Sequence, residues 1–96
     1  MKKILVTRKL LRTCEDKASK IFDVKLNSND ELYSQKNIID MSEGCDGILT
    51  SLTDKMDEET INKLPNTVKI LSNFAVGFGN IDLEAAKKRN CKKAAL

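Results

Sequence analysis

Two glycines separated by one residue, Gly77 and Gly79, lie in the stretch of this 96-residue chain best suited to bind a ligand. They belong to the run 73–82, which follows an apolar segment at 68–72 and precedes a helix-like segment at 83–89. A strand that leads through glycines to a helix start presents free backbone N–H groups, and the helix start favours negative charge. The run therefore indicates a site for a small anion such as a carboxylate. The alternative is a tight loop that needs glycine only for its geometry, because a lone GxG is weak evidence.

Other reactive residue combinations are missing from the sequence. The chain has three cysteines, no CxxC pair and no histidine, so a zinc site is not expected. Scattered thiols fit a reducing cytoplasm, which is the predicted location. The net charge is +3, but no basic stripe with interleaved aromatics suggests a nucleic-acid partner. The apolar run that follows Lys3 is too short for a signal peptide, and no membrane association is expected.

Four apolar segments and four helix-like segments must position the glycine loop. The expected strands are residues 3–7, 24–26, 46–50 and 68–72. The expected helix starts are Thr13, a capping box at 28–31, Asp57 and Asp82. Leu32 would face the sheet from the second helix, and Gly44 suits the end of that helix.

The alternation of strands and helices predicts the fold class. Connections of a dozen or more residues imply helical crossovers between parallel strands, and right-handed crossovers leave few topologies. We expect an α/β fold, a flavodoxin-like doubly wound parallel sheet of four strands in the order 2-1-3-4, with a fifth edge strand as an option and helices on both faces. The last segment, 90–96, carries no clear strand signal. Ligands of such sheets bind beyond the carboxyl ends of the strands, where residues 7–9, 51–53 and 74–77 should converge.

Several motifs then occur in the order and spacing of a known family. They are the opening KKILVTR at 2–8, CDGILTSLTDKMD at 45–57, LPN at 64–66 and VKILSNFAVGFGNID at 68–82. Together they resemble the N-terminal part of the D-isomer-specific 2-hydroxyacid dehydrogenases, with the greatest likeness to the glyoxylate/hydroxypyruvate reductase branch. The resemblance covers residues 1 to about 90.

The resemblance implies a function and a set of site residues. The family joins a flavodoxin-like substrate-binding domain to a Rossmann domain for NAD or NADP, and it passes a hydride between the nicotinamide and a small 2-keto or 2-hydroxy acid. By this likeness the backbone N–H groups of Val76 and Gly77 bind the substrate carboxylate, and Leu52 lines the substrate pocket. These implied roles agree with the anion site that the two glycines indicate by themselves.

The chain departs from the family pattern after Asn90. Residues 91–96 match neither the family's hinge nor its cofactor domain, and no GxGxxG fingerprint follows any strand. The catalytic Arg, Glu and His of the family lie in the part without a counterpart here, and this chain has no histidine to act as the general acid. We therefore expect residues 1–96 to be a single truncated substrate-binding domain with no catalytic residue, no metal and no bound NAD or NADP, inactive alone.

Two further functions stay open. One is a stand-alone flavodoxin-like module that binds a small anion at the Gly77 loop. The other is a self-associating fragment that forms a homodimer through exposed apolar surface, since loss of a partner domain would uncover such surface. A signalling receiver of the same topology is disfavoured, because Arg8-Lys9 and Thr50-Ser51 stand where that function needs acidic residues.

Overall fold

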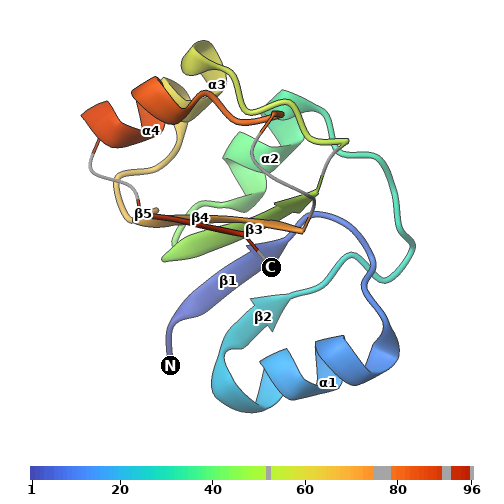
Figure 1. Cartoon of the computed structure of the whole chain (residues 1–96). Coiled ribbons are helices and arrows are strands. Elements are labelled where there is room, and N and C mark those ends of the chain that lie inside the picture. Colours follow the sequence, from blue (N-terminus) through green and yellow to red (C-terminus); the bar gives the residue numbers. More distant parts are fainter. Residues whose placement is uncertain (52, 75–78, 90–91, 96) are drawn as a thin grey trace.

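The computed structural model of the chain describes residues 1–51, 53–74, 79–89 and 92–95. Its five strands are β1 (Lys3–Val6), β2 (Asp23–Lys25), β3 (Gly47–Ser51), β4 (Ile70–Phe74) and β5 (Lys92–Ala95). They form one parallel sheet in the order β2-β1-β3-β4-β5 (Figure 1). The predicted order 2-1-3-4 is confirmed. The fifth edge strand is also present, in a segment without a clear strand signal.

Helices cover both faces of the sheet, but unequally. The helices are α1 (Arg12–Ile21), α2 (Gln35–Met41), α3 (Glu58–Lys63) and α4 (Leu83–Lys88). In Figure 1, α2, α3 and α4 lie over one face, and α1 lies on the other side beside β2. The buried core lies under the three helices and contains Leu5, Ile48 and Leu71 from the strands with Ile38, Ile61, Ala85 and Ala86 from the helices.

The opposite face of the sheet carries an open apolar groove. No residue of α1 is buried. The groove has a volume of about 390 Å³ and is lined mainly by apolar side chains, among them Ile4, Phe22, Val24, Leu49 and Ile70. Gly47 is paired with Ile4 on one side and with Ile70 on the other. A Cβ at Gly47 would lie 3.1 Å from Ile4 Cδ1 and 3.2 Å from the Ile70 carbonyl oxygen. The glycine therefore allows β3 to lie this near to β1 and β4.

The first two helices do not begin where the sequence predicts. Thr13 is not an N-cap, because α1 begins at Arg12 after Leu11, without a side-chain capping bond. The predicted capping box at 28–31 is also wrong. Asp30 has a φ of +51°, in the left-handed region, which is incompatible with the first turn of a right-handed helix.

The helix α2 begins instead inside the polar run that follows Leu32. The Ser34 Oγ accepts a hydrogen bond from the Asn37 N–H (3.1 Å), and the Asn37 Oδ1 accepts one from the Ser34 N–H (3.2 Å). This reciprocal pair is a capping box with asparagine in the third helical position. Leu32 therefore precedes the helix and is 70% exposed, contrary to the expectation that it faces the sheet.

The remaining helix signals are confirmed. Asp57 accepts a hydrogen bond from the Thr60 N–H (2.9 Å), and Asp82 accepts one from the Ala85 N–H (3.1 Å). Gly44, expected to stop the second helix, lies two residues after the C-cap Ser42, with a φ of +78° in the turn that leads away from α2. Among the described residues, no helix is long and apolar enough to cross a membrane.

Arg89, just after α4, ties this helix to the end of α3. Its guanidinium donates hydrogen bonds to four carbonyl oxygens, those of Ile61 (2.7 Å), Leu64 (3.1 Å), Pro65 (2.6 Å) and Val68 (3.3 Å). Ile61 lies in α3 and Leu64 is the C-cap of that helix, so Arg89 bonds both to the end of α3 and to the segment that follows it. Arg89 thus caps α3 from a neighbouring element.

Candidate functional site

Polar side chains gather at the carboxyl ends of β1, β3 and β4. Thr7 follows β1, Ser51 ends β3, and Asn73 lies near the end of β4. Thr7 and Asn73 are fully buried. This is the edge at which parallel sheets bind ligands, and it is also where the sequence predicts that three loops converge.

Asp54 holds the loop after β3 against β1. Its side chain is 2% exposed. The carboxylate oxygen Oδ2 accepts hydrogen bonds from the Thr7 hydroxyl, from the Ser51 N–H (2.9 Å) and from the Ser51 Oγ (3.3 Å). Its other oxygen, Oδ1, is buried and has no hydrogen-bond partner in the described part of the chain. One carboxylate therefore fixes two of the three converging segments.

Two asparagines join the loop after β3 to the segment before α4. The Asn80 Nδ2 donates to the carbonyl oxygens of Ser51 and Asp54, both at 2.9 Å. The Asn80 Oδ1 accepts a hydrogen bond from the Asn73 Nδ2 (2.8 Å). The Asn73 Oδ1 in turn accepts one from the Thr50 hydroxyl (3.0 Å). The ends of β3 and β4 and the start of α4 are thus linked by one polar network.

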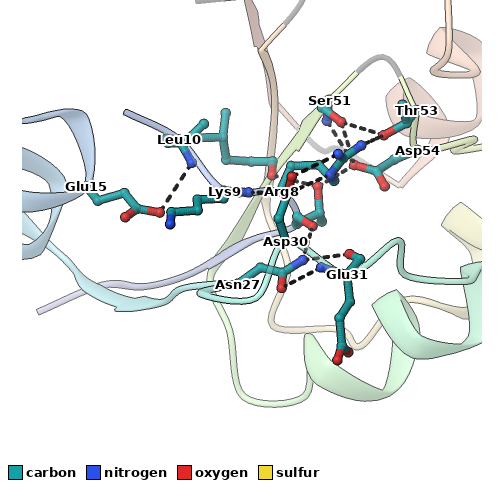
Figure 2. Close-up of polar contacts among 12 residues, drawn as sticks. Arg8, Lys9, Leu10, Glu15, Asn27, Asp30, Glu31, Ser51, Thr53 and Asp54 are labelled. Carbon is teal, nitrogen blue, oxygen red and sulfur yellow. Dashed lines mark hydrogen bonds and ion pairs between the residues drawn. The ribbon is translucent and has the colours of Figure 1, made fainter. Parts of the chain in front are cut away.

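An ion pair closes the outer side of the same edge. Figure 2 shows Arg8 between Asp30 and Thr53, with Arg8 Nε 2.8 Å from Asp30 Oδ1, Nη2 3.1 Å from Oδ2, and Nη1 2.9 Å from Thr53 Oγ1. The Lys9 N–H also donates to Asp30 Oδ1 (2.9 Å). The hydrogen bond from Arg8, followed by that from Lys9, lowers the pKa of Asp30 to about 2. Arg8 is therefore committed to Asp30 and Thr53 and offers little to an incoming anion.

The ion pair between Arg8 and Asp30 should make the free energy of unfolding depend on pH in the acid range. The pKa of Asp30 lies below its ordinary value of 3.8 in the folded chain, so its contribution is present above about pH 4 and is lost as the pH falls towards 2. In Asp30→Asn this loss should be smaller, because asparagine does not titrate but still tolerates the positive φ. Urea unfolding of both chains at pH 6, 4 and 2.5 measures the difference, with Asp16→Asn in α1 as the control. Equal acid losses in the wild type and Asp30→Asn would contradict the assignment.

The three site residues predicted from the sequence, Leu52, Val76 and Gly77, lie outside the described residues. The structure instead describes their neighbours in the chain, which are Ser51 and Thr53 around Leu52, and Phe74 and Gly79 around 75–78. A Cβ at Gly79 would meet no heavy atom of the described residues within 4 Å. Among the described residues, the space around position 79 therefore does not require a glycine.

Sequence reasoning missed Asp54, Asn73 and Asn80 as site residues. The available signal was the placement of the two asparagines on either side of the glycine pair, and of Asp54 three residues after Ser51. Among the described residues, no group of three or more His, Cys, Asp or Glu side chains could hold a metal ion. Gly44 follows the end of α2 and Gly47 lies within β3, so neither of these two glycines belongs to a strand-to-helix turn of the kind that binds a dinucleotide pyrophosphate.

The family model of the D-isomer specific 2-hydroxyacid dehydrogenase catalytic domain matches residues 4–94. A glycerate dehydrogenase from Hyphomicrobium methylovorum is 32% identical over 91 residues, which are 95% of this chain and 28% of that protein. A glyoxylate reductase from Korarchaeum cryptofilum is 32% identical over 87 residues, 91% of this chain and 26% of that protein. The chain therefore spans little more than a quarter of the length of these relatives.

Solved structures share the fold. A D-isomer specific 2-hydroxyacid dehydrogenase from a Polaromonas species, described as NAD-binding, superposes with a TM-score of 0.92 at 24% identity, over 97% of this chain and 29% of that chain. An NAD⁺-bound 3-phosphoglycerate dehydrogenase from Entamoeba histolytica gives a TM-score of 0.81 at 23% identity, over 98% of this chain and 32% of that chain. The sheet order and helix placement described above are thus those of these proteins.

Proposed function

Because this chain belongs to the D-isomer-specific 2-hydroxyacid dehydrogenases, through their catalytic domain, we propose that it is the substrate-binding part of such an enzyme. The reaction would be reduction of a small 2-keto acid, or oxidation of a 2-hydroxy acid, by hydride transfer. The observation that carries this proposal is the family match over residues 4–94 on a sheet whose carboxyl edge is built from polar, buried side chains.

The proposed substrate contacts are the backbone N–H groups of Val76 and Gly77, for the carboxylate, and the side chain of Leu52, for the pocket wall. The polar network supports this proposal through the described neighbours of these residues in the chain. Ser51 and Asp54, around Leu52, are bonded to Asn80, which follows the glycine loop in the chain. A site that binds one ligand through two loops needs such support, because its contacts must be held in place before the ligand arrives.

The cofactor of the whole enzyme would be NAD or NADP, held by residues outside 1–96. Gly44 and Gly47 do not lie in a dinucleotide-binding loop, and the chain contains no histidine. We therefore propose that it has no catalytic residue, binds no cofactor and does not turn over substrate by itself, since hydride transfer needs both reactants held in a fixed orientation. We further propose a cytoplasmic location, without a nucleic-acid or membrane partner.

Binding of a 2-keto acid by the pure chain tests the proposed site. Titration of ¹⁵N-labelled protein with glyoxylate or D-glycerate should shift the backbone amide signals of Val76 and Gly77 most, with weak affinity because residues 1–96 alone supply only part of the proposed contacts. Sulfate serves as the control anion without a carboxylate. A lack of shifts at these amides would contradict the site, and NADH-dependent reduction of glyoxylate by the chain would contradict its inactivity.

The open groove on the α1 side favours the second candidate, a homodimer. Ile70 is 40% exposed and Phe22 is 36% exposed along this apolar surface. We expect light scattering to show a dimer at high concentration, and Ile70→Lys to give a monomer because it places a charge in the groove. Leu32→Lys is the matched control, since Leu32 is exposed outside the groove. A monomeric wild type, or a dimer that survives Ile70→Lys, would contradict this proposal.

A further inference from the structure

Asn80 makes contacts that differ from those of an ordinary loop residue. Its side-chain amide donates to two main-chain carbonyls of one loop, those of Ser51 and Asp54, both at 2.9 Å. Its side-chain oxygen accepts from Asn73 Nδ2 at 2.8 Å. One half-buried side chain therefore bonds to both ends of the turn after β3 and to the last part of β4.

The backbone of Asn80 is itself anchored. Its carbonyl oxygen accepts a hydrogen bond from the Met56 N–H (2.8 Å), and the Asp82 N–H donates to the Met56 carbonyl (2.8 Å). Met56 and Ile81 form a parallel bridge, and their side chains are 0% and 6% exposed. The side chain of Asn80 thus extends from a fixed point, so its length sets the distance between the loop after β3 and the segment before α4.

The loop that Asn80 holds is fixed from the other side by Asp54. The carboxylate of Asp54 binds Thr7 and the Ser51 N–H, while Asn80 binds the Ser51 and Asp54 carbonyls. Hydrogen bonds in a buried network reinforce one another, and loss of one member leaves polar groups without partners. Ser51 and Asp54 are therefore held jointly by a contact to Thr7, which follows β1, and by a contact to Asn80, which precedes α4.

We propose that Asn80 is a positioning residue that fixes Ser51 and Asp54 relative to β4 and to the start of α4, and that binding of one small carboxylate ligand depends on this arrangement. The inference rests on the proposed carboxylate site, because Leu52 lies between Ser51 and Asp54 in the sequence, and Val76 and Gly77 precede Asn80. Asn80 itself is not assigned a contact with the ligand. Its role is to hold the groups that contact the ligand in a fixed relative position.

The test compares the wild-type chain with Asn80→Asp, which has the same shape and keeps the oxygen that faces Asn73 but lacks the amide hydrogens that bind Ser51 and Asp54. Asn80→Ala is the second variant, and Asn66→Asp, in an exposed turn, carries the same chemical change as a control. Residual dipolar couplings of the backbone amides report the orientation of each segment without any ligand. Titration with glyoxylate then gives the dissociation constant for each chain.

In both Asn80 variants, we expect the couplings of Ser51, Thr53 and Asp54 to depart from the orientation fitted to the strands, whereas Asn66→Asp should fit as the wild type does. The dissociation constant for glyoxylate should rise about tenfold or more, because a small misplacement of binding groups costs much of their effect. Couplings that still fit the strands, or an unchanged dissociation constant, would overturn the proposal. If the wild type itself does not bind glyoxylate, the carboxylate site fails, and the couplings still decide whether Asn80 orients the turn.

Discussion

Replacing Arg89 by alanine is expected to lower the free energy of unfolding by about 3 kcal/mol, since a charged donor that serves several carbonyls is lost. The guanidinium of Arg89 bonds to the carbonyls of Ile61, Leu64, Pro65 and Val68, which end α3 and begin the approach to β4. Water can replace these bonds only in part, because Ile61 and Val68 are fully buried.

A lysine at position 89 should recover only a small part of this loss. Its ammonium is a compact charge that cannot spread donors over several carbonyls as the planar guanidinium does. Urea unfolding curves measure the effect, provided that the slope with denaturant stays the same. Arg12→Ala, at the exposed start of α1, is the control and should change stability little. Full recovery of the free energy of unfolding with lysine would contradict this prediction. It would show that the positive charge at position 89, and not its set of directed hydrogen bonds, stabilises the fold.

Truncation of Leu71 to alanine should be at least as damaging, with a loss of about 3 to 4 kcal/mol. Leu71 is fully buried on β4, where it is paired with Ile48 of β3 on one side and with β5 on the other. Its removal would leave a cavity beneath the three helices that the surrounding strands cannot collapse into easily.

The matched control for this prediction is Leu32→Ala. It removes the same atoms from a side chain that is 70% exposed, so we expect a change within about 0.5 kcal/mol. Thermal and urea unfolding of the two variants separate the effect of burial from the effect of removing these side-chain atoms as such. A large effect at Leu32 would mean that this residue packs as the helical pattern first suggested, and not as the structure shows.

The topology was predictable because each strand and each long crossover leaves a local signal. Apolar runs such as 46–50 and caps such as Asp57 and Asp82 depend on neighbours within a few residues. The start of α2 was not predictable in this way. The sequence at 28–31 matches a capping box, but Asp30 is drawn into the left-handed conformation with its carboxylate on Arg8, 22 residues away.

The same distinction between local signals and contacts far along the chain applies to the site residues. The glycine pair stands out by residue type alone, so the neighbourhood of a ligand could be inferred from the sequence. Asn80 and Asp54 could not, because each acts through partners far along the chain, such as Ser51 for Asn80 and Thr7 for Asp54. An asparagine or aspartate in a loop has many local uses, and only the folded arrangement shows which partners it has.

The uneven cover of the sheet has a consequence for how the chain fluctuates. α1 has no buried residue, whereas α2, α3 and α4 each contribute buried side chains to the core. Segments with few buried apolar contacts open at low free-energy cost, and they do so without unfolding the rest. The helix α1 should therefore behave as a separate foldon whose amide hydrogens exchange through local opening. The polar network at the carboxyl ends of the strands, which is anchored to the elements beneath α2, α3 and α4, would keep its geometry during such openings.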